Sequence, residues 1–272
     1  MKRAEIATHI ADNLSQRKDT LKSQWRGHRV RAFTVDGLLP DALAKSMYDA
    51  FPATEDMRFK ESLRERKLIS AQMNKHNPLL EEAIYAFQDP RITALLEEIT
   101  GLRSLEPDAH LYAGGISMML KDHFLNPHID NSHDKDRNRY RVLNLLYYVT
   151  PGWDAPSGGN LELWDEGPKG KPREIPSRFN RLVVMQTDRH SWHSVNPVRA
   201  DGRRCCISNY TFSPYPTDDA EYFHVTSFRG RPDQFLRDLA LRADARLRME
   251  IRKLFTKGLF KTGHEYKRTD GY

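Results

Sequence analysis

The spacing of apolar residues changes at about residue 108, and this change constrains the fold more than any other feature of the chain. Before it, apolar residues recur at helical intervals in residues 1–16, 40–51, 78–88 and 90–101. After it, short alternating or apolar runs are separated by turns rich in proline and glycine. A series of short strands of this kind favours an antiparallel sandwich or jelly roll over a parallel sheet.

The individual elements follow from the same patterns. Residues 28–35 predict one strand within the helical half, and Gly101 is expected to end the helix that precedes it. Residues 233–255 predict a closing helix with apolar residues on one face. The clearest later strands are predicted at residues 116–121, 141–149, 159–164, 180–187 and 205–212.

The length of 272 residues suits one elaborated β-rich domain better than two independent ones. We expect a mainly β fold with flanking helices. Its parts are a helical support with one or two strands (about residues 1–105), a jelly-roll core (about 106–230) and a C-terminal helix and tail (about 231–272).

Composition excludes several classes of function. The formal net charge is +6, but basic and acidic residues are interleaved, so nucleic acid is not an expected partner. No apolar run is long enough to span a membrane, so we expect a soluble, intracellular protein. The two cysteines, Cys205 and Cys206, are adjacent and poorly placed for a disulfide, which fits a reducing cytoplasm.

A candidate metal site begins at the end of the strand expected before residue 130. His128 and Asp130 are two residues apart, so their side chains point to the same face of a strand. An imidazole and a carboxylate on one face can bind a divalent metal, and either His190 or His193 can supply a third ligand. Two imidazoles and one carboxylate leave three coordination positions open for ligands.

Two arginines lie about ten residues after His193, at the head of another predicted strand. The guanidinium of Arg203 or Arg204 can clamp a carboxylate with two parallel hydrogen bonds, as an oxo-diacid would require. Alternation would place Arg204 on one face together with Cys206, Ser208 and Tyr210, and Arg203 on the other.

Residues 108–214 resemble the prolyl-hydroxylase-type branch of the Fe(II)/2-oxoglutarate-dependent oxygenases. That family has His-x-Asp, a tyrosine-bearing strand, a Gly-Gly turn, a distal histidine and then a basic residue, and all occur here in this order. The resemblance implies a double-stranded β-helix core of the cupin-like kind. It also implies that His128, Asp130 and His193 are the catalytic metal ligands, and that Arg204 and Tyr148 bind the co-substrate.

The implied cofactors are Fe(II), 2-oxoglutarate as co-substrate and dioxygen, with ascorbate as a candidate stimulant. The implied reaction hydroxylates an aliphatic C–H bond while 2-oxoglutarate is decarboxylated to succinate. In halogenating relatives a small residue replaces the carboxylate ligand. Retention of Asp130 therefore predicts hydroxylation, or another oxidation such as desaturation, rather than halogenation.

The substrate is not set by these motifs. A free small molecule, such as an amino acid or a natural-product intermediate, is our preferred interpretation, because no peptide-binding repeat is visible; a prolyl or other residue in a protein is the alternative. A metal-binding cupin-like protein that uses no oxo acid is a further alternative, and it leaves Arg204 without a role. Residues 131–140 form a long charged segment, which makes Asn131, His133 and Arg141 candidate substrate contacts. A homodimer through the closing helix is also open.

Overall fold

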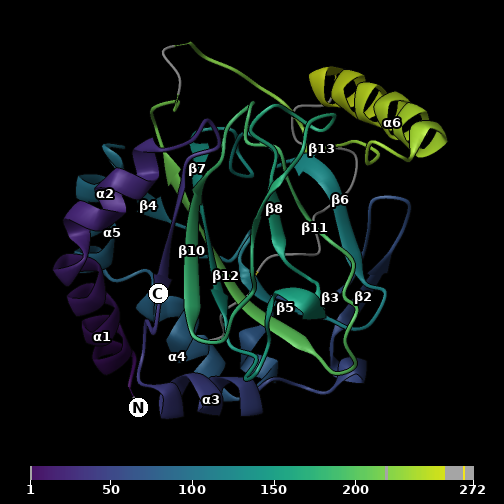
Figure 1. The fold of residues 1–272 in the computed structure, drawn as a ribbon. Coiled ribbons are helices and arrows are strands. Elements are labelled where there is room, and N and C mark those ends of the chain that lie inside the picture. The colour runs from purple at the N-terminus through teal and green to yellow at the C-terminus, as the bar shows by residue number, and fades with distance from the viewer. Residues whose placement is uncertain (1, 218–219, 255–265, 267–272) are drawn as a thin grey trace.

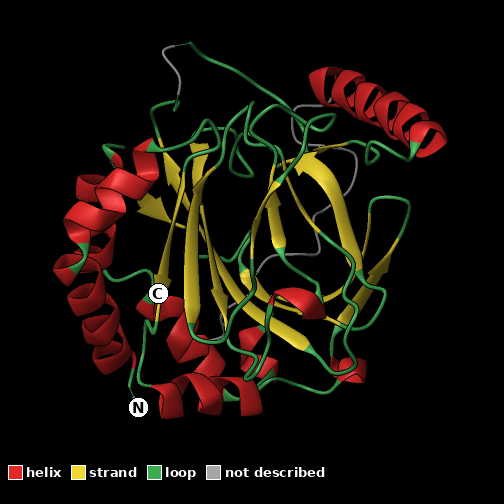
Figure 2. Cartoon of the chain, viewed as in Figure 1, coloured by secondary structure: helices red, strands yellow, loops and turns green. Residues whose placement is uncertain are grey.

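The computed structural model describes residues 2–217, 220–254 and 266, and its strands form one curled antiparallel sheet with the N-terminal helices packed against one side (Figures 1 and 2). The helices are α1 (Arg3–Gln16), α2 (Lys18–Arg26), α3 (Asp41–Asp49), α4 (Pro78–Ala86), α5 (Pro90–Thr100) and α6 (Phe235–Leu254). The strands are β1 (Ala32–Asp36), β2 (Arg58–Glu61), β3 (Glu65–Ser70), β4 (Glu106–Pro107), β5 (Gly115–Met119), β6 (Phe124–Ile129), β7 (Tyr140–Tyr148), β8 (Leu161–Leu163), β9 (Arg173–Ile175), β10 (Arg181–Gln186), β11 (His193–Val195), β12 (Arg204–Ser213) and β13 (Ser227–Phe228).

The order of strands shows how the sheet curls around a site. Along the sheet the order is β1-β10-β7-β12-β5-β3-β6-β11-β8-β9, and β2, β4 and β13 pair at its margins. Strand β3 joins the two halves, because one end of it pairs with β5 and the other end pairs with β6. The sheet closes into a half-barrel, which confirms the predicted jelly-roll core.

Strand alternation divides the apolar residues between two layers. On β10, Leu182 and Val184 face the helices and belong to the main hydrophobic core. Val183 and Met185 face the other way and pack inside the curled sheet. Because both faces of this strand are buried, its sequence is a continuous apolar run rather than an alternating one. Helices α1, α4 and α5 contribute the outer layer and so support the wall from which the site is built.

The helices predicted in the first hundred residues are confirmed with small shifts at their ends. Gly101 ends α5 in the left-handed conformation, with φ of 76°, as expected of a C-cap glycine. The prediction of one or two strands before residue 105 was wrong, because β1, β2 and β3 all lie there. The β2–β3 hairpin was missed because charged residues dominate it and hide any alternation, while pairing of β3 with β5 and β6 stabilises it.

The closing helix α6 packs against β13 and lies at the periphery of the molecule (Figure 1). Leu241 is its buried contact residue, whereas Leu236, Leu239 and Leu247 are exposed. The ion pair between Arg229 and Asp238, with N–O distances of 2.6 and 2.9 Å, ties its first turns to the segment after β13. The part of the predicted helix and tail beyond residue 254, residue 266 excepted, lies outside the described residues.

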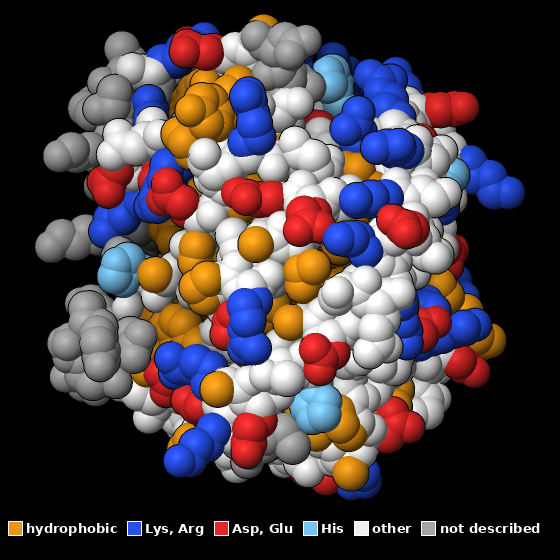
Figure 3. All heavy atoms as spheres, turned by 90° about the vertical axis from the view of Figure 1, so that its left-hand side faces the viewer, with side chains coloured by type: hydrophobic (Ala, Val, Ile, Leu, Met, Phe, Trp, Pro, Cys, Tyr) orange, Lys and Arg blue, Asp and Glu red, His pale blue; other side chains and the backbone are white. Residues whose placement is uncertain are grey.

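Basic and acidic side chains are not segregated into separate patches on the face shown in Figure 3. Figure 3 shows basic and acidic side chains interleaved over the face that carries the N-terminal helices, in keeping with the charge pattern of the sequence. Among the described helices, none is both long and apolar enough to cross a membrane.

Candidate metal centre

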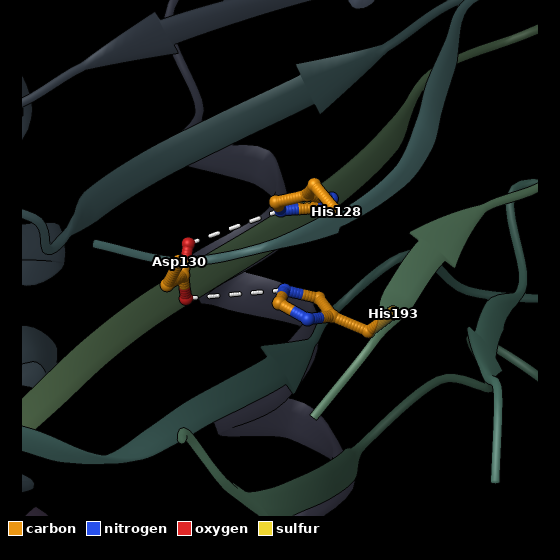
Figure 4. A group of neighbouring side chains, drawn as sticks. All are labelled: His128, Asp130 and His193. Atoms are coloured by element: carbon orange, nitrogen blue, oxygen red, sulfur yellow. Dashed lines mark ion pairs between the residues drawn. The ribbon is translucent and has the colours of Figure 1, made fainter. Parts of the chain in front are cut away.

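The candidate metal ligands converge at the junction of β6 and β11. His193 is the first residue of β11 and pairs directly with His128 on β6, while Asp130 follows the end of β6. One carboxylate oxygen of Asp130 lies 3.8 Å from Nε2 of His128, and the other lies 3.9 Å from Nε2 of His193 (Figure 4). The three ligand atoms lie within 4.8 Å of one another, so these residues can hold a metal ion.

Hydrogen bonds orient both imidazoles. Nδ1 of His128 lies 3.0 Å from the carbonyl oxygen of Asn126, and Nδ1 of His193 lies 2.9 Å from that of Ser191. Since a carbonyl only accepts, each Nδ1 carries a proton, which leaves each Nε2, on the side of Asp130, as the nitrogen available to a metal. The ring of Phe228 stacks on His128, with centroids 4.8 Å apart, and restricts its rotation. This arrangement matches the outer-shell support that metal-bound histidines usually have.

The electrostatics of the centre favour the metal-binding forms. Burial, followed by the charge of His193, lowers the pKa of His128 to about 3, so its imidazole is neutral at pH 7. Burial tends to raise the pKa of Asp130, but nearby charges, with Arg141 foremost, outweigh it and lower the pKa. One buried oxygen of Asp130, Oδ2, has no hydrogen-bond partner among the described residues. A divalent cation fits this donor set, because it would satisfy the carboxylate and both lone pairs at once.

The centre opens into a cavity of about 360 Å³. Strand β12 contributes Arg204, Cys206, Ser208 and Tyr210 to its lining, so these four share one face as alternation predicted. Arg203 points to the other side, where its guanidinium donates to the carbonyl oxygens of two residues at the end of α3.

Arg204 is a buried cation, with only 4% of its surface exposed. Its Nε and Nη2 donate to Oγ of Ser177 at 3.2 and 3.1 Å, and its guanidinium lies 4.6 Å from the centroid of the Tyr148 ring. No carboxylate pairs with it in the part of the chain that the structure describes. A buried cation without a counter-ion suits the carboxylate of a ligand.

The Gly-Gly turn positions the partner of Arg204. Ser177 donates its hydroxyl proton to the carbonyl of Gly159 at 2.7 Å, and so turns its lone pairs to the arginine. Gly158 has φ of 72°, and a Cβ there would lie 2.2 Å from the carbonyl oxygen of Pro197. The turn therefore requires glycine for both its conformation and its close backbone approach.

Tyr148 lies against Arg204 but does not line the cavity itself. Its hydroxyl is buried and makes no hydrogen bond among the described residues, and burial raises its pKa to about 12. The phenol therefore stays neutral and can donate a hydrogen bond to a ligand held by Arg204. Its role as a co-substrate contact stays a prediction.

Of the three residues predicted to contact substrate, only one lines the cavity. Arg141 lines the cavity, and its Nη1 lies 3.6 Å from Oδ1 of Asp130. Asn131 and His133 do not line it: Asn131 donates to the carbonyl of His133 at 2.6 Å, and Nδ1 of His133 bonds to Oγ of Ser132. His190, the alternative third ligand, is exposed.

Several residues that line the cavity had no role in the site predicted from the sequence. Asn144 and Tyr210 face each other across β7 and β12, and the amide of Asn144 donates to the Tyr210 hydroxyl at 3.1 Å. The alternation of β12 could have identified Tyr210, since it shares a face with Arg204. Lys60 and Lys67, on the unpredicted β2–β3 hairpin, also line the cavity and gave no comparable signal.

Comparison with known proteins agrees with this geometry. Residues 114–212 match the model of the 2OG-Fe(II) oxygenase superfamily. Mouse prolyl 3-hydroxylase OGFOD1 is 33% identical over 97 residues, which is 34% of this chain and 17% of that protein. Human Egl nine homolog 1 is 31% identical over 104 residues, covering 38% of this chain and 23% of that protein. The matched segments thus span less than a third of these curated relatives.

Solved structures share the fold. A Trichoplax adhaerens prolyl hydroxylase, in complex with a peptide from the hypoxia-inducible factor oxygen degradation domain, superposes with a TM-score of 0.55. It is 17% identical, and the match covers 74% of this chain and 91% of that one. A Phytophthora capsici prolyl 4-hydroxylase gives 0.54 at 19% identity, covering 95% and 81%. These matches confirm the predicted double-stranded β-helix architecture.

Proposed function

Because residues 114–212 match the model of the 2OG-Fe(II) oxygenase superfamily, we propose that this protein is an Fe(II)- and 2-oxoglutarate-dependent dioxygenase that hydroxylates a prolyl or other residue in a protein. The curated relatives that match include proteins named as prolyl hydroxylases, and one structural neighbour holds a peptide. They support a protein substrate better than the free small molecule that the sequence alone led us to prefer.

One observation carries the proposal: two imidazoles and a carboxylate converge on one point inside the cavity, and the pKa values of His128 and Asp130 are both lowered there. His128, Asp130 and His193 would hold Fe(II), and the remaining positions would be open to ligands. Hydrogen bonds from both Nδ1 atoms keep the rings aimed at that point. Arg141 keeps Asp130 ionised and so preserves its affinity for a cation.

The buried Arg204 would bind the far carboxylate of 2-oxoglutarate, with the Tyr148 hydroxyl beside it. Once bound, iron, 2-oxoglutarate and dioxygen supply the oxidation, with 2-oxoglutarate decarboxylated to succinate as the substrate C–H bond gains a hydroxyl group. Asp130 occupies the position that halogenating relatives leave to chloride, which supports hydroxylation. A cupin-like metal protein without an oxo acid would leave the Arg204 cation without a counter-ion.

We also propose that the described chain is a single oxygenase domain. The support is that β1 and β3, from the N-terminal part, belong to the same sheet as the strands of the core. Helices α1, α4 and α5 share their hydrophobic core with β7 and β10, so they would not be stable alone.

The test is an anaerobic titration of the metal-free protein with Fe(II) and then 2-oxoglutarate, followed by the visible charge-transfer band of a chelated keto acid. We expect a band that requires both additions. His193→Ala should abolish it, whereas His190→Ala, which changes an exposed histidine three residues away, should leave it intact. A protein that binds a divalent metal and gives no band would contradict the proposal in favour of a cupin-like metal protein.

A further inference from the structure

The outer part of the cavity carries more positive charge than the proposed co-substrate requires. Four cationic side chains border it, and we call them the basic rim: Lys60, Arg64 and Lys67 on the β2–β3 hairpin, and Arg248 on α6. Arg141 adds a fifth cation deeper in the cavity.

Only part of this charge is neutralised by the protein. Glu65 lies 3.6 Å from Nζ of Lys60 and 2.9 Å from Nζ of Lys67, so one carboxylate serves two lysines. Asp244 is likewise shared by Arg64 and by Arg248, the latter at 3.0 Å. With Arg141 counted, five cations face two rim carboxylates, which leaves three positive charges uncompensated.

The metal centre does not account for the excess. A divalent cation with Asp130 carries one positive charge, and the Arg204 cation adds another. A doubly charged oxo-diacid cancels both. Burial lowers the pKa of Lys60, and burial followed by Arg64 lowers that of Arg248, as expected for cations that lack full compensation.

The rim spans two elements that are joined across the cavity. Arg64, at the turn of the hairpin, forms an ion pair with Asp244 of α6, so the hairpin tip lies next to this helix (Figure 1). Lys60 and Lys67 are directly paired across the hairpin and point to the same side. Arg66, between Glu65 and Lys67, points to the opposite side, where it pairs with Glu61 at 3.2 Å.

Exposure increases outward along these cations. Arg204 and Arg141 are nearly inaccessible, whereas the side chains of Lys60, Arg64 and Arg248 are 37%, 33% and 29% exposed. A ligand that meets all of them must extend from the centre to the surface. A single small anion at Arg141 would leave the rim uncompensated, whereas a chain with several carboxylates matches it.

Resting on the proposed function, we propose that the basic rim binds an acidic segment of the polypeptide substrate, with Asp or Glu residues flanking the residue that is hydroxylated. The substrate carboxylates join Glu65 and Asp244 as partners of the rim cations and place the target residue at the metal. Charge complementarity of this kind contributes specificity and association rate more than affinity.

The test is binding, measured by fluorescence anisotropy, of three labelled proline-centred peptides of equal length. Their flanking residues are Asp and Glu, Ser and Gln, or Lys and Arg, and the protein is kept anaerobic with Fe(II) and 2-oxoglutarate. We expect the acidic peptide to bind tightest, by about tenfold at low salt, and its advantage to shrink as salt rises. Equal binding of the three peptides, or a preference for the basic one, overturns the proposal.

Charge reversal provides a matched pair of variants. Lys67→Glu should abolish the preference for the acidic peptide, whereas Arg66→Glu makes the same change in net charge one residue away and should retain it. If circular dichroism shows that Lys67→Glu does not fold, Lys67→Gln should reduce the preference. A preference unchanged by either Lys67 variant refutes the rim. Equally effective competition by a single-stranded oligonucleotide also refutes it, because the rim would then be a general polyanion site.

These outcomes separate the rim from the proposed function. If the charge-transfer band forms and the three peptides bind equally well, the proposed role of the rim is wrong and the proposed oxygenase function stands. If the protein prefers the acidic peptide but gives no charge-transfer band, the rim binds acidic peptides and the proposed oxygenase function is wrong.

Discussion

Replacement of Arg204 by methionine should weaken ligand binding strongly without a comparable loss of folding stability. Methionine has a similar length and no charge, so it retains much of the packing beside Tyr148 and Met119 while it removes the cation. In the ligand-free protein the guanidinium is buried and its hydrogen bonds go to the neutral Ser177 hydroxyl and the Met119 sulfur.

The magnitudes follow from this environment. Two hydrogen bonds between a guanidinium and a carboxylate contribute about 1.5–3 kcal/mol each. Their loss should weaken 2-oxoglutarate binding by roughly a hundredfold to roughly twenty-thousandfold, since about 1.4 kcal/mol is tenfold. For folding, loss of the stacking and of the Ser177 bonds costs about 1–2 kcal/mol, and removal of a buried unpaired charge returns about 1–4 kcal/mol. The free energy of unfolding should therefore fall by no more than about 1 kcal/mol.

The assay is titration of the charge-transfer band with 2-oxoglutarate, alongside urea unfolding of the metal-free protein. Arg203→Met is the matched control, because the guanidinium of Arg203 points away from the cavity, where it donates to backbone carbonyls near the end of α3 and lies over the Tyr48 ring. We expect this control to bind 2-oxoglutarate normally. The reasoning is refuted if Arg204→Met retains the parental affinity, or if it destabilises the protein by several kcal/mol.

Three further predictions concern the centre and its support. The pKa of His128 is about 3 in the folded metal-free protein and near 6.5 when unfolded. The unfolded state therefore binds more protons between these values, and the free energy of unfolding should fall as pH drops from about 6.5 toward 3. Urea midpoints should show a weaker pH dependence in His128→Leu. Arg141→Met removes the main charge that opposes the effect of burial on Asp130, so the pKa of that carboxyl should rise; Mn(II) affinity measured by calorimetry should then decline more steeply below pH 6 than in the parent, and parallel curves would contradict this role. Gly158→Ala combines a positive φ with a clash against Pro197 and should cost at least about 2 kcal/mol in urea unfolding, whereas Gly152→Ala, with a similar φ but open space, should cost about 1 kcal/mol; equal costs would show that the clash is relieved.

Strand alternation, which is local in sequence, allowed much of the site to be predicted. His128 and Asp130 point the same way because they are two residues apart, and Arg204 shares a face with Tyr210 for the same reason. Helical spacing likewise predicted α1, α4 and α5, and Gly101 marked the end of α5 because that position needs a left-handed residue.

The sequence by itself therefore determined the short-range geometry, and only the tertiary structure decided which distant segments meet. Residue chemistry alone left His190 and His193 open, and only the family resemblance favoured His193. The physical reason is the register of β11 against β6, which places His193 opposite His128. The β2–β3 hairpin depends on β5 and β6 for its stability, so its charged residues gave no strand signal and the rim that it forms was not foreseen. Side-chain periodicity acts within a few residues, whereas strand pairing and burial depend on contacts between residues far apart in the chain.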